Sequence, residues 1–343
     1  MKATIKDVAK LAGVSFKTVS RVINREPSVG EELKAKVWEA VEELNYQPNL
    51  SARQMRGGAS FIAFIYDNPN SHYVIDMQHG ILGECKKQGY ELLIHPSDSR
   101  SDDVVEELER LASNSHIAGL VLTPPFSESE ELIQSLLAKQ VSFVRILSGS
   151  SGPDTLSPCV FVDDFQAAYD ITDYLIRLGH RDIGFLGGEE AHRSSMERLK
   201  GYRAALMHHD IAVDDSLILP GDYNFESGTS RTEQLFQRQP RPTAIFACND
   251  EIAAGALFAA RINEVAVPQE LSIAGFEDSP FSRQTWPKLT TAHQPNTSIA
   301  ECAANMLIHA VREAKQAQNC EALPSSGFSP KLVARDSTGP APQ

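Results

Sequence analysis

Long apolar runs are missing from this sequence of 343 residues. No stretch approaches the roughly 20 apolar residues that a membrane-spanning helix needs, and segment 1–7 lacks the apolar core of a secretory signal peptide. Both absences predict a cytoplasmic protein with no membrane partner. Hydrophobic residues make up 42% and charged residues 22% of the chain. That balance is ordinary for globular domains, and the length suggests two or three of them.

Metal-ligand spacings and catalytic motifs are also missing. The five cysteines are scattered along the chain, and no two have metal-ligand or redox spacing, so we expect reduced, buried thiols and no metal site. We find no Gly-x-Gly-x-x-Gly after the first expected strand, no Walker loop and no Gly-x-Ser-x-Gly elbow. The sequence therefore predicts no enzyme, no catalytic residues and no cofactor. An enzyme on a doubly wound fold stays open as an alternative, and it would turn over a sugar or nucleoside.

Basic charge is scarce overall but is concentrated at the N-terminus. The net charge is −13, yet residues 1–60 hold ten Lys or Arg against seven Asp or Glu, a local net of +3. The remaining residues hold 22 against 38, a net of −16. A basic module attached to an acidic body is compatible with nucleic-acid binding, which the global charge conceals.

Three short helices are expected before residue 46. Thr4 and Asp7 form a capping-box pattern, and Gly13 follows the last apolar position of the first helix. Ser15 can cap a second helix, and a third helix begins near Glu31. Their apolar faces are Ile5, Val8, Ala9 and Ala12, then Val19, Val22 and Ile23, then Leu33, Val37, Val41 and Leu44, before Asn45 and Pro48. Two helices joined by a tight turn and packed on a third form a helix-turn-helix unit.

The second helix has the polar residues that a recognition helix needs where it enters the major groove. Lys17 and Arg21 can contact guanine edges or phosphates, and Phe16 can contact thymine methyl groups. The hydroxyls of Ser15, Thr18 and Ser20 suit phosphate oxygens. A solvated polar face, with Phe16 in the core, is the alternative that these residue types leave open.

From residue 60 the sequence alternates short apolar strands with helices such as Asp164–Leu178. The expected strands are Phe61–Tyr66, Tyr90–His95, Ala118–Thr123, Ser142–Leu147, Cys159–Asp163, Ile183–Gly187, Ala244–Cys248 and Leu271–Phe276. Such alternation predicts an α/β fold with doubly wound parallel sheets covered on both faces. Because about 270 residues exceed what one core supports, we expect two lobes with a cleft between them.

Polar residues follow several of these strands, where a cleft between two parallel sheets binds its ligand. They are Asp67, Asn68, Asp163, Asp164, Asn249, Asp250, Glu277 and Asp278. Carboxylates and amides can pair with the hydroxyls of a sugar. Other readings stay open: Asp164 and Asp250 as helix caps, His180 as a turn residue, and Trp286 as core.

Two sets of motifs resemble the lactose-repressor/galactose-repressor (LacI/GalR) family of bacterial transcriptional regulators. The N-terminal set is Thr4-Ile-Lys-Asp-Val-Ala-Lys-Leu-Ala-Gly-Val-Ser15, Thr18-Val-Ser-Arg-Val-Ile-Asn24 and Leu44-Asn-Tyr-Gln-Pro-Asn49. The second set is Leu178-Gly-His-Arg181, Arg198-Leu-Lys-Gly-Tyr202, Arg241-Pro-Thr-Ala244 and Leu289-Thr-Thr291. The resemblance extends to about Asp336. It implies a helix-turn-helix headpiece joined to a two-lobed, periplasmic-binding-protein-like sensor.

The resemblance implies that double-stranded operator DNA is a partner and that the protein is a homodimer. Phe16 and Lys17 occupy the positions that choose the operator, and Met55 occupies that of a residue wedged into the minor groove. A dimer matches a pseudo-palindrome by symmetry. No leucine heptads follow Asp336, so we expect no tetramer. The implied DNA-binding set is Thr4, Ser15, Phe16, Lys17, Thr18, Ser20, Arg21, Asn24, Asn49, Ala52 and Met55.

A small-molecule effector is the second implied partner. The implied effector-binding set is His72, Tyr73, Asp163, Arg198, Tyr223, Asn249, Glu277, Trp286 and Gln294. Sugar-responsive relatives usually carry Gly-Phe-Asp-Asp-Ser where this chain has Gly275-Phe-Glu-Asp-Ser279. The carboxylate of Glu277 is one methylene longer, so its reach into the cleft differs.

These observations predict a repressor of carbohydrate-utilisation genes that a sugar or sugar derivative releases from DNA. A purine- or nucleoside-responsive co-repressed regulator is the alternative. A transport solute-binding protein is disfavoured, because it needs a signal peptide and has no headpiece. The expected parts are a headpiece at 1–48, a hinge helix at 49–58, a sensor at 59–336 and a disordered tail at 337–343. Within the sensor we expect an N-subdomain at 59–158 and 290–318, and a C-subdomain at 159–289 and 319–336.

Overall fold

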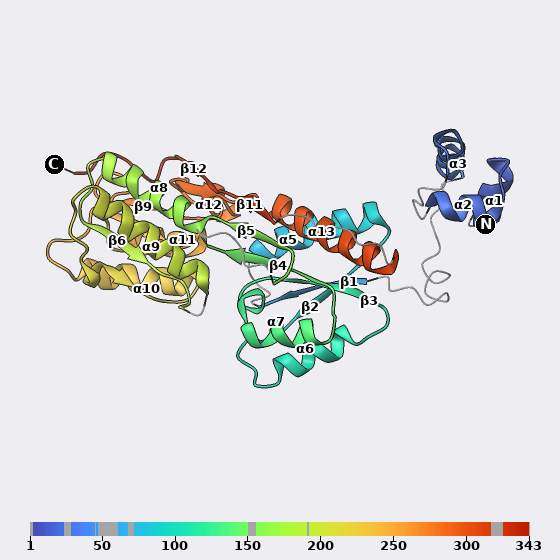
Figure 1. The fold of residues 1–343 in the computed structure, drawn as a ribbon. Coiled ribbons are helices and arrows are strands. Elements are labelled where there is room, and N and C mark those ends of the chain that lie inside the picture. Colours follow the sequence, from blue (N-terminus) through green and yellow to red (C-terminus); the bar gives the residue numbers. More distant parts are fainter. Residues whose placement is uncertain are drawn as a thin grey trace. The chain divides into compact units, whose positions relative to one another are not determined.

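The computed structural model describes residues 3–23, 29–44, 46, 61–67, 72–149, 156–190, 192–316 and 325–342. The chain forms two compact units, Met1–Ser60 and Phe61–Gln343 (Figure 1). We describe each unit by itself.

Within its described residues, the first unit has three helices where the sequence predicts them: α1 (Ile5–Leu11), α2 (Phe16–Ile23) and α3 (Glu31–Glu43). The Asp7 carboxylate accepts hydrogen bonds from the Thr4 backbone N–H at 2.8 Å and from the Thr4 hydroxyl at 2.6 Å, which anchors the start of α1. Gly13 ends α1 with a φ of 65°, a conformation that favours glycine. The core of this unit consists of Val8, Ala9, Val19, Val22, Val29, Val37, Ala40 and Tyr46.

The first lobe of the second unit contains a six-stranded parallel sheet in the order β11-β5-β4-β3-β1-β2. Helices α5 and α13 pack against each other, while α6 and α7 lie on the other side of the sheet (Figure 1). The strands are β1 (Phe61–Tyr66), β2 (Glu91–Pro96), β3 (Ile117–Leu122), β4 (Phe143–Ser148), β5 (Cys159–Val162) and β11 (Ser326–Phe328). The helices are α5 (His72–Gln88), α6 (Val104–Ala112), the short 3-10 helix η1 (Phe126–Glu128), α7 (Glu130–Ala138) and α13 (Asn296–Gln316).

The sequence of strand β1 is a continuous apolar run rather than an alternating one, because both of its faces are buried. Ile62 and Phe64 belong to the core under α5 and α13, whereas Ala63 and Ile65 belong to the core under α6 and α7. All four side chains are fully buried. Both faces of the parallel sheet are therefore covered, as the sequence predicts.

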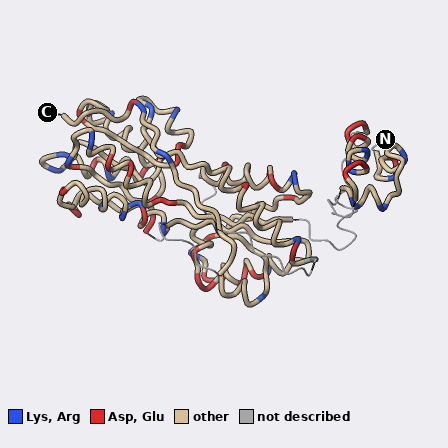
Figure 2. Tube along the Cα trace, turned by 45° about the horizontal axis from the view of Figure 1, so that its top comes forward, with Lys and Arg blue, Asp and Glu red and all other residues tan. Residues whose placement is uncertain are grey.

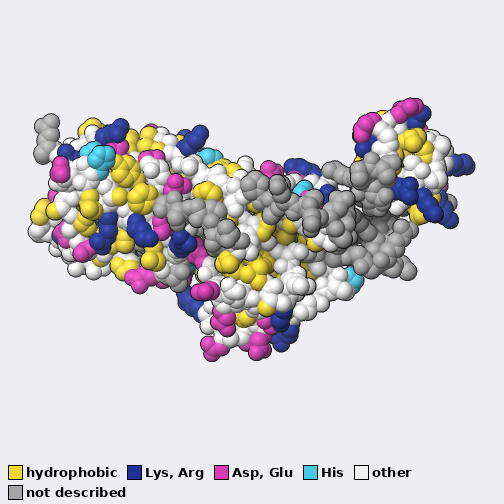
Figure 3. Space-filling view, viewed as in Figure 1, with side chains coloured by type: hydrophobic (Ala, Val, Ile, Leu, Met, Phe, Trp, Pro, Cys, Tyr) yellow, Lys and Arg dark blue, Asp and Glu magenta, His cyan; other side chains and the backbone are white. Residues whose placement is uncertain are grey.

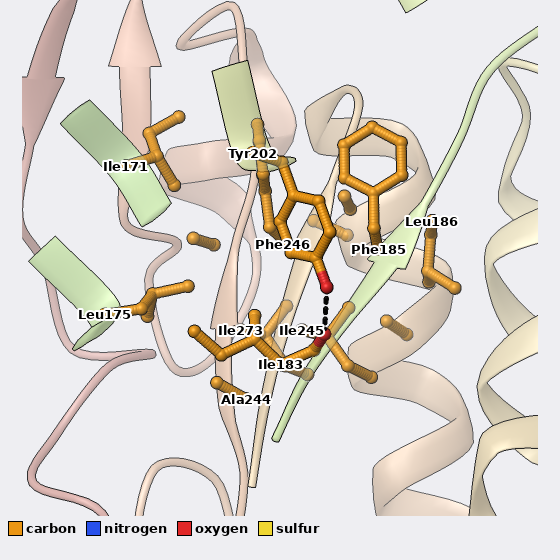
Figure 4. Close-up of a cluster of buried hydrophobic side chains, with 14 of the residues drawn as sticks. Ile171, Leu175, Ile183, Phe185, Leu186, Tyr202, Ala244, Ile245, Phe246 and Ile273 are labelled. Atoms are coloured by element: carbon orange, nitrogen blue, oxygen red, sulfur yellow. Dashed lines mark hydrogen bonds between the residues drawn. The ribbon is translucent and has the colours of Figure 1, made fainter. Parts of the chain in front are cut away.

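The second lobe contains a four-stranded parallel sheet in the order β7-β6-β8-β9. Its core surrounds Tyr202, whose hydroxyl donates a hydrogen bond to the Ile183 carbonyl at 2.7 Å (Figure 4). The strands are β6 (Ile183–Leu186), β7 (Ile218–Leu219), β8 (Ala244–Ala247) and β9 (Ser272–Ala274). The helices are α8 (Asp164–Arg177), α9 (Arg193–His208), the 3-10 helix η2 (Asp215–Leu217), α10 (Phe225–Phe236), α11 (Asp250–Ile262) and α12 (Pro280–Gln284).

The expected boundaries between the lobes are wrong at three points. Strands β5 and β11, expected in the C-subdomain, pair in the sheet of the first lobe. Strand β10 (Thr291–His293), expected in the N-subdomain, pairs antiparallel with β12 (Lys331–Val333), and Thr290 bridges to β9 in the second lobe. An apolar strand pattern predicts a strand but does not say which sheet it joins.

The expected disordered tail is also wrong for residues 337–342. Ser337 is buried; its hydroxyl donates to the Ile273 carbonyl at 2.5 Å and accepts from the Thr290 N–H at 2.8 Å. Further along, the Ala341 N–H donates to the Leu178 carbonyl at 2.9 Å. Small polar residues therefore satisfy the backbone at the edge of β9, a role that composition does not reveal.

Replacing Ser337 with alanine should lower the free energy of unfolding by about 1–3 kcal/mol, because a buried N–H and a buried carbonyl lose their partner. Thermal unfolding followed by circular dichroism measures the change. The matched control is Ser329→Ala, which removes the same hydroxyl at an exposed position. Equal melting temperatures for the two variants would contradict the anchoring role of the tail.

Across the part of the chain that the structure describes, we find no helix with the length and apolarity to cross a membrane.

Candidate functional site

Helix α2 turns its apolar side inward and its polar side outward. Val19 and Val22 are buried, while Phe16, Lys17 and Arg21 are exposed. The structure thus places Phe16 on the surface and not in the headpiece core, with 36% of its surface accessible. Helices α1 and α2 are mainly basic, with Lys6, Lys10, Lys17 and Arg21 against Asp7, whereas α3 carries five Glu against Lys34 and Lys36 (Figure 2).

The hydroxyl residues of this region are partly engaged by the fold. The Ser15 hydroxyl accepts the Thr18 N–H at 3.1 Å and lies 2.9 Å from the Thr18 hydroxyl, so Ser15 caps α2 as predicted. Thr4 is exposed at the start of α1, and Ser20 is half-buried on α2. Four predicted DNA-binding residues, with the hinge segment 49–58, lie outside the described residues: Asn24, Asn49, Ala52 and Met55.

A cavity of about 290 Å³ lies between the two lobes, beyond the carboxyl ends of their strands. Charged side chains of both signs gather where the lobes meet (Figure 3). The sequence predicted nine effector-binding residues, and six of them line the cavity: Tyr73, Arg198, Tyr223, Asn249, Glu277 and Gln294. Polar side chains that follow parallel strands are thus brought to one place, as the doubly wound fold requires.

Three predicted residues lie elsewhere. His72 packs edge-on against the Phe281 ring, with ring centroids 5.5 Å apart. Asp163 accepts the Gln166 N–H at 3.0 Å and caps α8, while the neighbouring Asp164 lines the cavity. Trp286 is 81% exposed and lines a separate groove on the second lobe, so it belongs neither to the cleft nor to the core.

Arg198 on α9 is held on three sides. Its Nε donates to Asp164 Oδ1 at 2.7 Å, and its Nη1 donates to the Cys248 carbonyl at 2.5 Å. The guanidinium carbon also lies 3.8 Å from the centre of the Phe276 ring. Although burial opposes the charge, the Asp164 carboxylate raises the pKa of Arg198 above its ordinary value. A fixed, permanently charged donor is therefore built into the wall of the cavity.

Tyr223 is fixed in the cavity by its hydroxyl and by the space beside its ring. The hydroxyl bonds to the Ser195 hydroxyl at 2.7 Å and to the Ser194 hydroxyl at 3.1 Å. A Cβ atom on Gly188 would lie 2.2 Å from the ring, so only glycine leaves room for it there. The aromatic ring is thus a preorganised surface for a flat ligand face.

Asn249, and not Asp250 as the sequence suggested, caps α11. The Asn249 side-chain oxygen accepts the Ile252 N–H at 2.8 Å and caps α11. Asp250 does not cap this helix: it accepts the Ser279 N–H at 2.7 Å and the Thr291 hydroxyl at 2.6 Å. Burial raises the pKa of Asp250 to about 7. Asp250 therefore braces the segment that carries Glu277, and Asn249 both caps its helix and reaches the cavity.

Glu277 has a φ of 99°, which is unusual for a residue with a side chain. Its backbone N–H donates to the Ala292 carbonyl at 2.9 Å, which ties this segment to β10. Burial raises the pKa of the Glu277 carboxyl to about 8, although the charge of Arg198 opposes the rise. Strained, buried carboxyl groups of this kind are concentrated at functional sites.

His180 has a structural role in the second lobe. The His180 ring is buried and bonds to the Thr243 hydroxyl at 2.9 Å and the Ser272 hydroxyl at 3.0 Å, which is a structural role in the second lobe. Burial lowers the pKa of His180. Within the described ranges, no group of His, Cys, Asp and Glu residues could hold a metal ion.

The sequence reasoning missed the residues that bridge the two lobes. Arg100 of the first lobe pairs with Glu189 of the second at 2.9 Å. Glu128 accepts the Arg193 N–H across the same gap at 3.3 Å, and burial raises the pKa of Glu128 to about 7. A rule that collects polar residues after every strand would have found Arg100 after β2 and Glu189 after β6.

The raised pKa of Glu277 predicts a pH-dependent stability. A glutamate binds its proton less tightly in the unfolded chain, near 4.5, than in the folded one, near 8. Its contribution to stability is therefore complete below about pH 4.5 and is lost as the pH rises through about 8. The melting temperature of Glu277→Gln, minus that of the parent protein, should increase steadily from pH 5.5 to pH 8.5.

The control for this pH series is Glu226→Gln, at an exposed position in the first turn of α10. Its difference from the parent protein should not change over the same range. A difference for Glu277→Gln that also stays constant would show that this carboxyl titrates normally.

Comparison with known proteins matches both units. Residues 4–49 match the family described as bacterial regulatory proteins, lacI family, and residues 172–338 match the periplasmic binding protein-like domain. The HTH-type transcriptional repressor PurR of Edwardsiella ictaluri is 32% identical over 342 residues, which covers 99% of this chain and 98% of PurR. PurR of Klebsiella pneumoniae is 33% identical over 344 residues, with the same coverage.

Two solved structures share the fold over nearly the whole chain. The complex of the transcriptional regulator CelR with cellobiose has a TM-score of 0.74 and 26% identity, and the match covers 98% of this chain and 100% of CelR. The lac repressor dimer bound to its operator and an anti-inducer has a TM-score of 0.71 and 24% identity, over 99% and 100% of the two chains. The chain therefore belongs to the lacI family of bacterial regulatory proteins and is a DNA-binding transcriptional repressor, not an enzyme.

Proposed function

We propose that this repressor controls carbohydrate-utilisation genes and leaves its operator when a sugar or sugar derivative binds between the lobes. The lining of the cavity is the observation that carries the proposal. Carboxylate, amide and guanidinium groups stand beside the rings of Tyr73 and Tyr223. Polar groups of this kind pair with sugar hydroxyls, and aromatic rings cover the apolar face of a sugar. CelR, similar over its full length, binds cellobiose.

A purine-responsive regulator is the second candidate. The observation that favours it is the similarity to PurR repressors, which extends over 98% of their length. The same aromatic rings could stack on a nucleobase, and Glu277 could accept its N–H groups. In this alternative the ligand would strengthen operator binding instead of releasing it.

In this function a homodimer in the cytoplasm recognises the operator. Two headpieces related by a two-fold axis match the two halves of a pseudo-palindrome. Segment 49–58 would act as a hinge that folds on DNA, with Asn49, Ala52 and Met55 near the central minor groove. Thr4, Ser15, Thr18, Ser20 and Asn24 would contact the backbone of each half-site, and Phe16, Lys17 and Arg21 its base edges.

Replacing Lys17 with alanine should change which operators are preferred, because a lost base contact costs about 1–3 kcal/mol at that base pair only. Selection from a randomised operator library, followed by sequencing, measures the change. The matched control is Lys10→Ala, the same substitution at an exposed position of α1. That variant should keep the parent preference. An unchanged preference for the Lys17 variant would remove Lys17 from the specificity set.

Fluorescence anisotropy on the DNA upstream of the chain's own gene tests the proposed effector class. The full-length protein is titrated into labelled DNA with a panel of sugars and with a panel of purine bases and nucleosides. A sugar that weakens DNA binding at least tenfold supports the first candidate. A response to a nucleobase, with none to any sugar, would replace it by the second.

A further inference from the structure

Negative charge dominates the lining of the cavity. Five carboxyl groups line it, against two guanidinium groups, those of Arg100 and Arg198. The carboxyl groups are those of Asp67, Asp98, Asp164, Glu189 and Glu277, of which Glu277 becomes charged only as the pH approaches its raised pKa of about 8. His192 adds no positive charge, because burial lowers the pKa of its ring. The excess of negative charge in the lining therefore disfavours the binding of an anion.

Both guanidinium groups are already paired. Arg198 holds Asp164 at 2.7 Å and the Cys248 carbonyl, and Arg100 holds Glu189 across the lobes at 2.9 Å. No further Lys or Arg lines the cavity among the residues that the structure describes. A phosphate or carboxylate group entering here would have to compete with a protein carboxylate for its counter-ion, which is costly away from water.

One acceptor group in the lining of the cavity has no donor among the described residues. The Gln294 side-chain oxygen is buried and has no hydrogen-bond partner among the described residues, and its residue is only 6% exposed. The Gln294 side-chain NH₂ is engaged, since it donates to Asn296 at 2.7 Å. An unpaired buried acceptor is stabilised when a ligand donates to it, and uncharged hydroxyl groups can do so.

We propose that the effector is an uncharged, hydroxyl-rich sugar and that the cavity excludes phosphorylated and carboxylated forms of the same sugar. This inference rests on the proposed function, because it presumes that the cavity takes a sugar. The exclusion comes from Asp67 and Asp98 together with the pairing of both guanidinium groups, and Gln294 selects for a hydroxyl donor.

Glu277 adds a pH-dependent part to this selection. Burial raises the pKa of its carboxyl to about 8; Arg198 on α9 opposes the rise, and the nearby Asp164, Asp250 and Glu251 reinforce it. Near neutral pH the protonated group can both donate to a hydroxyl and accept from one. Above pH 8 the group becomes a carboxylate and adds to the repulsion of an anion.

Isothermal titration calorimetry of the full-length protein at constant ionic strength tests the proposal. The probes are glucose, glucose 6-phosphate and glucuronate, and cellobiose with cellobiose 6-phosphate. We expect each anionic form to bind about 100-fold more weakly than the parent sugar that binds, as repulsion by like charges at short range implies. A phosphorylated form that binds as tightly as its parent sugar, or more tightly, would overturn the proposal while leaving a sugar effector intact.

Two variants identify the groups responsible. Asp98→Asn removes one charge but keeps the oxygen that accepts the Arg100 backbone N–H. The ratio of the dissociation constant of the anionic sugar to that of its parent sugar should therefore fall about tenfold. The matched control is Asp102→Asn, the same change at an exposed position outside the cavity lining, which should leave the ratio unchanged. Equal ratios in Asp98→Asn and its control would contradict the assigned cause.

The contribution of Glu277 is tested by the pH dependence of the same ratio. In the parent protein the ratio should increase from pH 7 to pH 9, and in Glu277→Gln it should stay constant.

Failure of the proposed function gives a different result from failure of the anion exclusion. If no sugar binds but guanine or hypoxanthine does, the sugar assignment is wrong. The same comparison then uses the base and its nucleoside monophosphate. Weaker binding of the monophosphate would support the exclusion of anions, and equal or tighter binding would overturn it.

Discussion

Replacing Arg198 with methionine is expected to abolish effector binding and to lower the free energy of unfolding by about 3–5 kcal/mol. Asp164 is 2% exposed, and after the change its carboxylate would be buried without its counter-charge. Its remaining contact, the hydroxyl of Ser148, does not carry a charge. Calorimetry with the active ligand and urea unfolding measure the two effects. Effector affinity should fall at least about 100-fold, because a charged donor is lost from the wall.

The double variant Arg198→Met, Asp164→Asn separates the two roles of Arg198. Removing the orphaned charge should restore most of the stability, since it is the unpaired carboxylate that is costly. Effector binding should not return, because the guanidinium group is still missing. A double variant that binds the ligand normally would show that Arg198 only neutralises Asp164.

Replacing Val19 with aspartate is expected to lower operator affinity at least about 100-fold while effector affinity changes little. Val19 is fully buried in a headpiece whose core, among its described residues, has eight buried side chains. A small domain has little stability to lose, so one buried, unpaired carboxylate is sufficient to unfold it. The sensor forms a separate compact unit with its own cores and should stay folded.

Leu33→Asp is the matched control, because Leu33 is 40% exposed on α3 of the same unit. This variant should bind the operator within about tenfold of the parent protein, as expected for a surface substitution. Anisotropy on operator DNA and calorimetry with the effector compare the two variants. Loss of effector binding in Val19→Asp would mean that the two units do not fold independently.

Local patterns predicted the elements of this fold because each pattern reports on a short range of sequence. The helical spacing of Val19 and Val22 predicted the buried side of α2, and the apolar run at Phe61–Tyr66 predicted β1 to the residue. Polar residues after strands predicted Asn249 and Glu277 at the cavity. These predictions succeeded because parallel strands share one carboxyl edge.

Predictions that needed long-range pairing failed. Nothing local assigns β5 and β11 to the first sheet, because that depends on partners distant in sequence. The order of Ser337 likewise depends on hydrogen bonds to Ile273 and Thr290. At the start of α8, the sequence likewise does not decide which of Asp163 and Asp164 caps the helix. Both are suitable cap residues, and only the backbone direction decides that Asp163 caps α8 and Asp164 faces the cavity.

The bridges between the lobes suggest how ligand binding could reach the DNA. The pair Arg100–Glu189 and the hydrogen bond to Glu128 both join the two lobes beside the cavity. A ligand changes DNA binding only if it favours one arrangement of the lobes over another. We therefore expect the effector to act by changing the fraction of molecules in which these contacts between the lobes are formed.

We expect that one chain couples operator binding to the occupancy of the cavity. The most direct measurement determines the dissociation constant of the effector on the free protein and on the operator complex, and that of the operator with and without saturating effector. Both constants should change by the same factor, typically about 5- to 150-fold, because coupling between two sites is reciprocal. An effector that binds free and operator-bound protein equally tightly would contradict this coupling.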